Sequence, residues 1–296
     1  MKFIILDTET TGTKEPDRII QLSFLITNEN NEIEEIHDTL CMPPVPISYE
    51  AMAIHHITPE IIVNTQPLQK TETYKRLIEM NSSENILVIH NAKFDLEMLF
   101  KDDFENRMQL IDTFRVLKHI QPDDRHSLQV NRYALGLYKK EKELTDRYNL
   151  EINPHNALSD VIILKLLLDY LMFEKNYSVE KLIELTKTPI LYDKFYSGKY
   201  KREKIIDIIE KDPEYIEYML TTNDFELDFD MRYSINYYLQ EKELEFKFKV
   251  GKYKGLTAKE VAENGDYDYL RWAFHNMKMD KGLRNQIGEI IGVIQK

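Results

Sequence analysis

The chain has 296 residues, of which 43% are hydrophobic and 30% charged, and 51 acidic against 39 basic residues give a formal net charge of −12. The apolar fraction is ample for packed cores, so global disorder is excluded, and the length fits about two domains. The negative charge excludes nucleic-acid binding through bulk charge alone, although it is compatible with local basic contacts.

Three features bear on the location of the protein. No apolar run reaches the roughly 20 residues that a membrane span needs. The residues after Met1 lack a signal-peptide pattern, and the single cysteine, Cys41, cannot form an internal disulfide. We therefore expect a cytoplasmic protein with no membrane partner.

The first half of the chain begins with strands and continues with alternating helices and strands. The strands are predicted at residues 2–6, 19–27 and 33–40, with a polar turn at 28–31. Further on, the pattern predicts a strand at 86–89 and helices at 68–80, 94–100, 127–137 and 158–173. Three strands joined by short turns predict an antiparallel meander, and the later alternation predicts a mixed α/β layer fold.

The second half contains an internal repeat. Residues 195–201 (FYSGKYK) match residues 248–254 (FKVGKYK), and a helical pattern rich in aromatic residues follows each copy. Arg202 stands where the second copy has Gly255. We predict three parts, at residues 1–175, 176–240 and 241–296.

The first motif with chemical content follows the N-terminal strand pattern. Asp7 and Glu9 lie two residues apart in DTETTG (7–12), so strand geometry places both carboxylates on one face. Neighbouring carboxylates repel unless a cation lies between them, and such hard oxygen ligands suit Mg²⁺ or Mn²⁺. A polar strand end that enters a turn is the alternative.

Two further motifs place acidic residues near the starts of helices. In HNAKFD (90–95), Asn91 is a candidate helix cap and Asp95 lies one turn into the helix. In HNALSD (155–160), His155 lies at the helix entry and Asp160 follows about one and a half turns later. Each motif alone also fits an ordinary polar helix start, but the three together favour a common site.

The three motifs, in this order, resemble the DEDDh family of 3′–5′ exonucleases, which have a ribonuclease H-like fold. Residues 46–58 (PISYEAMAIHHIT) and the tail segments GKYKG (251–255) and YLRWAF (269–274) are similar to the exonuclease X branch, in which the tail module occurs once. The resemblance implies an α/β ribonuclease H-like mixed sheet flanked by helices, followed by two small, mainly helical modules. The first module is the divergent copy.

The resemblance also implies an activity. It is that of a metal-dependent 3′–5′ exodeoxyribonuclease of DNA repair, which releases nucleoside 5′-monophosphates by two-metal-ion hydrolysis. The metal ligands that it implies are Asp7, Glu9, Asp95 and Asp160, with two Mg²⁺ or Mn²⁺ ions per site. His155 is the implied general base, because a histidine titrates near neutral pH and can take a proton from the attacking water.

Substrate contacts are expected beside the carboxylates and in the tail. Thr8 and Thr10 are expected to bind the terminal nucleotide, and by resemblance His55 and Ile57 line a nucleobase pocket; a surface loop is the alternative for His55. In the tail, phosphates and unpaired bases are the expected partners of Lys252, Tyr253 and Lys254. A turn with a core aromatic residue and solvated lysines is the alternative there.

Four aromatic residues of the tail recur at helical spacing and are predicted to form the module cores: Tyr215, Tyr218, Tyr269 and Trp272. The expected partner of the whole chain is the 3′ end of single-stranded DNA. An exoribonuclease that trims RNA is the nearest alternative, since the sequence holds no sign of a filter for the 2′-hydroxyl. A non-catalytic subunit that binds 3′ ends is the alternative from another class.

Overall fold

The computed structural model describes residues 1–122, 125–152, 156–222, 227–279 and 281–294. The chain divides into two compact units, Met1–Thr188 and Pro189–Lys296, which we describe separately. Within the described residues, no helix combines the length and the apolar character that crossing a membrane requires.

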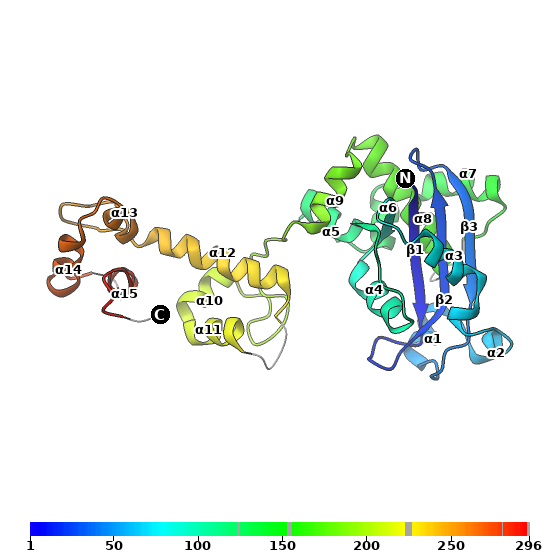
Figure 1. Ribbon diagram of the computed structural model, residues 1–296, viewed down its shortest axis with the longest axis horizontal. Coiled ribbons are helices and arrows are strands. Elements are labelled where there is room, and N and C mark those ends of the chain that lie inside the picture. The colour runs from blue at the N-terminus through cyan, green and yellow to red at the C-terminus, as the bar shows by residue number, and fades with distance from the viewer. Residues whose placement is uncertain (123–124, 153–155, 223–226, 280, 295–296) are drawn as a thin grey trace. The chain divides into compact units, whose positions relative to one another are not determined.

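A five-stranded mixed sheet forms the centre of the first unit (Figure 1), with the strand order β3-β2-β1-β4-β5. Its strands are β1 (Phe3–Thr10), β2 (Ile19–Thr27), β3 (Ile33–Leu40), β4 (Ile86–Ile89) and β5 (Gln109–Asp112). The first three form the predicted antiparallel meander, while β4 pairs in parallel with β1 and β5 in parallel with β4. β1 continues beyond the predicted end at residue 6, so Asp7 and Glu9 lie within the strand.

Helices cover both faces of this sheet. They are α1 (Tyr49–His55), α2 (Pro59–Ile62), α3 (Glu72–Met80), α4 (Ala92–Lys101), α5 (Thr113–Ile120), α6 (Leu128–Ala134), α7 (Tyr138–Tyr148), α8 (Ala157–Asp169) and α9 (Val179–Lys187). Two short segments complete the unit, the 3₁₀ turn η1 (Leu68–Lys70) and the π-helical turn η2 (Tyr170–Glu174). The predicted mixed α/β fold is confirmed.

The alternation of side chains along β1 decides which residues meet which helices. Phe3 and Ile5 belong to the core that contains the apolar residues of α8, whereas Ile4 and Leu6 belong to the core under α3 and α4. Because successive side chains of a strand point to opposite faces, Asp7 lies on the α8 face and Thr8 on the α4 face. At the end of β1, polar side chains therefore lie on both faces of the sheet, with Asp7 on one face and Thr8 on the other.

The predicted end of the catalytic part at residue 175 is too early. Helix α9, which begins at Val179, packs against β5 and α5 of the first unit. Its Thr186 hydroxyl accepts a hydrogen bond of 2.9 Å from the backbone N–H of Asp112, and the guanidinium of Arg115 donates to the Thr186 carbonyl. These contacts make α9 part of the sheet domain, which ends at Thr188.

The second unit is helical and repeats one local structure. Its helices are α10 (Ile205–Lys211), α11 (Pro213–Thr221), α12 (Phe229–Glu245), α13 (Ala258–Glu263), α14 (Tyr267–Asn276) and α15 (Lys281–Ile290). An isolated antiparallel bridge precedes α10 at Lys194 and Lys204, and another precedes α13 at Lys247 and Thr257. Each copy has its own apolar core, one around Phe195 and one around Phe248. The predicted division between the copies at residues 240 and 241 falls within α12.

The GKYK motif of each copy is used for internal contacts. In the second copy, the Lys252 amino group and the Tyr253 hydroxyl both bind the Asp266 carboxylate, at 2.7 and 2.8 Å. Asp266 also caps α14, because its other oxygen accepts the backbone N–H of Tyr269 at 3.0 Å. The first copy repeats this arrangement with Lys199, Tyr200 and Asp212.

The two copies differ in residue type at one turn position but keep the same backbone conformation there, and both expose an aromatic side chain. Gly255 has a φ of 87°, and Arg202, at the same place in the first copy, keeps a φ of 74° although side chains disfavour this region. The predicted core role of Tyr218 and Trp272 is wrong, because these side chains are 46% and 53% exposed. Tyr215 and Tyr269 do pack against the module cores, as predicted.

Candidate active site

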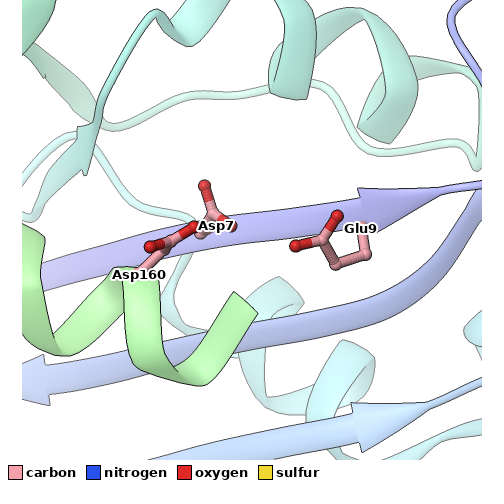
Figure 2. A group of neighbouring side chains, drawn as sticks. All are labelled: Asp7, Glu9 and Asp160. Carbon is pink, nitrogen blue, oxygen red and sulfur yellow. The ribbon is translucent and has the colours of Figure 1, made fainter. Parts of the chain in front are cut away.

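Three carboxylates converge where β1 ends and α8 begins (Figure 2). Asp7 and Glu9 project from β1, and Asp160 projects from the first turn of α8 toward them. One oxygen from each of the three lies within 4.8 Å of the others. The spacing of two residues on a strand and the position of Asp160 on its helix thus bring together three of the four predicted ligands, and Asp95 is not among these three.

The start of α8 is fixed to the sheet by a side chain of β2. The Gln21 side-chain oxygen accepts hydrogen bonds of 3.3 Å from the Ala157 backbone N–H and from the Asn156 amide. Asn156 in turn caps the helix by accepting the N–H of Ser159. Because Gln21 pairs with Glu9 in the β1–β2 ladder, this contact sets the position of Asp160 relative to the β1 carboxylates.

The cluster is electrostatically strained without a cation. Burial, followed by the charges of Asp95, Asp160 and Glu9, raises the pKa of Asp7 well above its ordinary value. Burial and the charges of Asp160 and Asp95 raise the pKa of Glu9 to about 8. Several buried carboxylates cannot all be charged unless positive charge compensates them.

Asp95, on α4, is close enough for its charge to raise the pKa values of Asp7 and Glu9, although it is not one of the three clustered carboxylates. It is 4% exposed, rather than a surface residue, and its carboxylate accepts a 2.7 Å hydrogen bond from the Thr8 hydroxyl. Burial raises the pKa of Asp95 to about 7, against the opposing effect of that hydrogen bond. The Thr8 hydroxyl, expected to bind substrate, therefore holds one of the predicted ligands.

Asp112 caps α4, a role that the sequence pattern assigned to Asn91. Asn91 is left-handed, with a φ of 70°, and its side chain makes no capping hydrogen bond. The Asp112 carboxylate at the end of β5 accepts the backbone N–H groups of Asn91 and Ala92, at 3.0 and 3.1 Å. The same carboxylate caps α5, so one side chain fixes the start of the helix that carries Asp95.

Sequence reasoning missed a polar network that positions Asp160. The Gln129 side chain of α6 donates a 2.6 Å hydrogen bond to the Asp160 carboxylate. Arg132 donates to the Gln129 oxygen at 3.3 Å and binds Glu141 of α7 through two contacts of 2.6 Å. Because Arg132 holds the amide oxygen, the amide N–H₂ of Gln129 faces Asp160. The (i, i+3) spacing of Gln129 and Arg132 was the only sequence signal of this network.

A pocket of about 620 Å³ adjoins the carboxylate cluster. Its lining includes Thr8, Glu9, Thr10, Ser48, Ile54 and His55. Ile57, predicted to line the nucleobase pocket, lies instead in a buried apolar cluster with Ile20 and Ile62. The half-exposed Ile54 takes that place in the lining.

His55 is a buried residue at the end of α1 rather than a surface histidine. Its Nδ1 accepts the Ile57 backbone N–H at 2.9 Å, so Nε2 carries the proton and donates to the Thr10 carbonyl at 3.2 Å. Burial lowers the pKa of His55 below its ordinary value, which favours the neutral ring. Both ring nitrogens are engaged, so His55 offers the pocket an apolar ring surface.

The remaining predicted residues lie elsewhere. His155 falls outside the described residues. Lys252 and Tyr253 both bind Asp266, and the centre of the Tyr253 ring lies 4.9 Å from that of Tyr269, so both residues take part in contacts within the module. Lys254 is exposed, and its role as a phosphate contact stays a prediction.

Residues 4–168, more than half of the chain, match the protein family described as "RNase_T: Exonuclease". The chain belongs to this family, and it is a 3′–5′ exonuclease, a phosphodiester hydrolase. The predicted family and its ribonuclease H-like fold are thereby confirmed.

Individual proteins are similar over different parts of the chain. Exodeoxyribonuclease 10 of Escherichia coli strain K12 is 26% identical over 240 residues, which cover 80% of this chain and 98% of that protein. DNA polymerase III subunit epsilon of Treponema pallidum is 31% identical over 141 residues, 45% of this chain and 63% of that protein. A structure of exonuclease X with 5′-overhanging duplex DNA matches 62% of this chain and 98% of that chain, with a TM-score of 0.48 and 24% identity.

Proposed function

We propose that the chain is a metal-dependent 3′–5′ exodeoxyribonuclease, which releases nucleoside 5′-monophosphates from DNA 3′ ends. The observation that carries this proposal is the convergence of Asp7, Glu9 and Asp160, with oxygens within 4.8 Å of one another. DNA is favoured as the substrate because Exodeoxyribonuclease 10 is similar over 80% of this chain. A role in DNA repair is part of the same proposal.

The residues of the cluster fit a divalent cation. All of the donors are carboxylate oxygens, the ligands that Mg²⁺ and Mn²⁺ prefer, and the raised pKa values of Asp7 and Glu9 indicate uncompensated negative charge. Four residues would hold two such ions: Asp7, Glu9, Asp160 and, as the fourth ligand, Asp95. Bound divalent cations stabilise the negative charge that develops on a phosphate during hydrolysis.

The protein's own groups place the substrate and move the proton. The pocket beside Glu9 takes the terminal nucleotide, with Ile54 and the ring of His55 against the base. We assign the general base to His155, whose ring would accept a proton from the attacking water. Replacing His155 by alanine is expected to lower the cleavage rate by about 10²–10⁴-fold, and a neutral effect would assign the base elsewhere.

The test uses 5′-labelled single-stranded DNA and RNA of matched sequence, with Mg²⁺ and with EDTA. We expect a ladder that shortens from the 3′ end of DNA and is absent in EDTA and in Asp7→Ala. Degradation of RNA without degradation of DNA would show that the protein is an exoribonuclease that trims RNA. Binding of 3′ ends without any cleavage would overturn it in favour of a non-catalytic subunit.

A further inference from the structure

The second copy of the tail repeat contains a hollow of about 220 Å³ with lysines at its edge. Lys247, Lys249 and Lys278 line it, and all three are exposed. Its other lining residues are apolar, among them Phe248, Met277 and Leu283. We call this feature the lysine-rimmed hollow. Three positive charges around an apolar floor are unexpected in a chain with a net charge of −12.

The local backbone explains how the lysines reach the edge. Phe248 is 1% exposed and anchors the core of the copy, so its neighbours Lys247 and Lys249 point away from that core. Lys278 lies between Met277 and Met279, just after the end of α14. Two separate segments thus bring charge to one apolar surface.

The first copy of the repeat has a different charge at the same place. Tyr196 stands where the second copy has Lys249, and Asp230 stands where it has Gly282. Burial, together with the nearby carboxylates of Asp228 and Asp230, raises the pKa of Tyr196 to about 12. The first copy therefore lacks a lysine at the place of Lys249 and has a further carboxylate at the place of Gly282, although it keeps Lys194 at the place of Lys247.

We propose that the lysine-rimmed hollow binds single-stranded DNA, with one base on its apolar floor and the lysines on the flanking phosphates. The proposal rests on the proposed function, because the DNA is the substrate of the catalytic unit. The hollow is smaller than the roughly 300–1,000 Å³ of pockets for drug-sized ligands, so it suits a single base. Bases of single strands are free to leave the stack, and basic surfaces with apolar contacts bind such strands.

The proposed DNA contact is at the lysine-rimmed hollow, whereas the sequence pattern placed it at the GKYK turn of the same module. Lys252 and Tyr253, which the sequence pattern favoured, are held by Asp266 and stabilise the turn. Lys247, Lys249 and Lys278 lie outside that cluster. The motif shared by both copies thus maintains the fold, and the lysines around the hollow carry the binding; of these, Lys249 is replaced by Tyr196 in the first copy.

The experiment measures binding of a fluorescent oligothymidylate to the full chain by anisotropy in EDTA, in an Asp7→Asn background. The test variant carries Lys247→Glu, Lys249→Glu and Lys278→Glu. The matched control carries the same change of charge in the first copy, at the exposed residues Lys194, Lys201 and Lys204. We expect the test variant to bind at least about tenfold more weakly at about 0.1 M salt. Its salt-dependence slope should also fall by about 2, because three phosphate contacts are lost.

Equal affinities of the two triple variants would overturn the proposal, as would an equal loss of affinity for blunt duplex DNA. A triple variant with glutamine in place of the three lysines distinguishes lost binding from misfolding, because circular dichroism shows whether it is folded. We expect this variant also to bind weakly. Hydrolysis of the p-nitrophenyl ester of thymidine 5′-monophosphate, measured with Asp7 restored, reports on the catalytic unit. Both triple variants should retain that hydrolysis. A chain that binds DNA through the hollow but hydrolyses nothing would refute the proposed function alone.

Discussion

Replacing Glu9 by glutamine tests the electrostatic description of the active site. Burial and the charges of Asp160 and Asp95 raise the pKa of Glu9 from 4.5 to about 8. Between these pH values the folded chain holds a proton at Glu9 that the unfolded chain has lost, so stability falls as the pH rises. At about 1.4 kcal/mol per pKa unit, ionised Glu9 lowers the free energy of unfolding by as much as about 5 kcal/mol above pH 8.

Glutamine keeps the size of the side chain and removes its charge. Metal-free Glu9→Gln is therefore expected to unfold at a higher temperature than the wild type at about pH 8.5, with a much smaller difference at about pH 5. A gain of as much as about 5 kcal/mol corresponds to a rise of as much as about 10–20 °C in the unfolding temperature of a unit of this size. Mg²⁺ should reverse the order, because the wild type alone keeps all the carboxylates that bind it.

Differential scanning calorimetry in EDTA and in Mg²⁺, at both pH values, measures these shifts. The transition that responds to Mg²⁺ identifies the first unit. Glu29→Gln, in the exposed turn after β2, makes the same chemical change away from the site and should have no effect. Identical behaviour of the two variants in EDTA at high pH would refute the reasoning.

Substitutions at three further positions test the groups around the cluster. Asp160→Asn should abolish metal-dependent cleavage and leave the circular dichroism spectrum unchanged; residual cleavage within about tenfold of the wild type would exclude Asp160 as an essential ligand. Gln129→Leu removes the donor to Asp160 and should lower activity by about 10–100-fold, with a higher Mg²⁺ requirement; an unchanged Mg²⁺ titration would show that the contact is dispensable. Thr8→Val should cost a similar factor, because the hydroxyl that orients Asp95 is lost, whereas Thr8→Ser should retain most activity; equal rates for the two variants would contradict that role.

Local patterns in the sequence were sufficient for four of the five strands of the sheet and for the placing of three site residues, whereas β5 was not predicted. The meander followed from alternating apolar strands and a polar turn, and the same alternation placed Asp7 beside Glu9. Asp160 followed from its position after the start of a helix. In each of these cases, the residues that determine the structure are close together in the sequence or belong to one helix or strand.

Contacts between distant segments were beyond such patterns. Asp112 took the cap expected of Asn91, because β5 ends next to β4 and brings its carboxylate to the start of α4. Gln129 meets Asp160 across 31 positions in the chain. Trp272 occurs at a helical spacing that fits a core position, yet it faces solvent, since helical period alone does not say how wide the buried face is.

The Lys–Tyr–Asp cluster also affects how the tail can assemble. Its members lie within 14 residues of one another in each copy, so closing the loop between them costs little chain entropy. Each turn can therefore form without waiting for contacts from the other copy. A module whose stabilising contacts are local can be duplicated in tandem without domain swapping between the two copies. The surface residues of one copy can then diverge without loss of the fold.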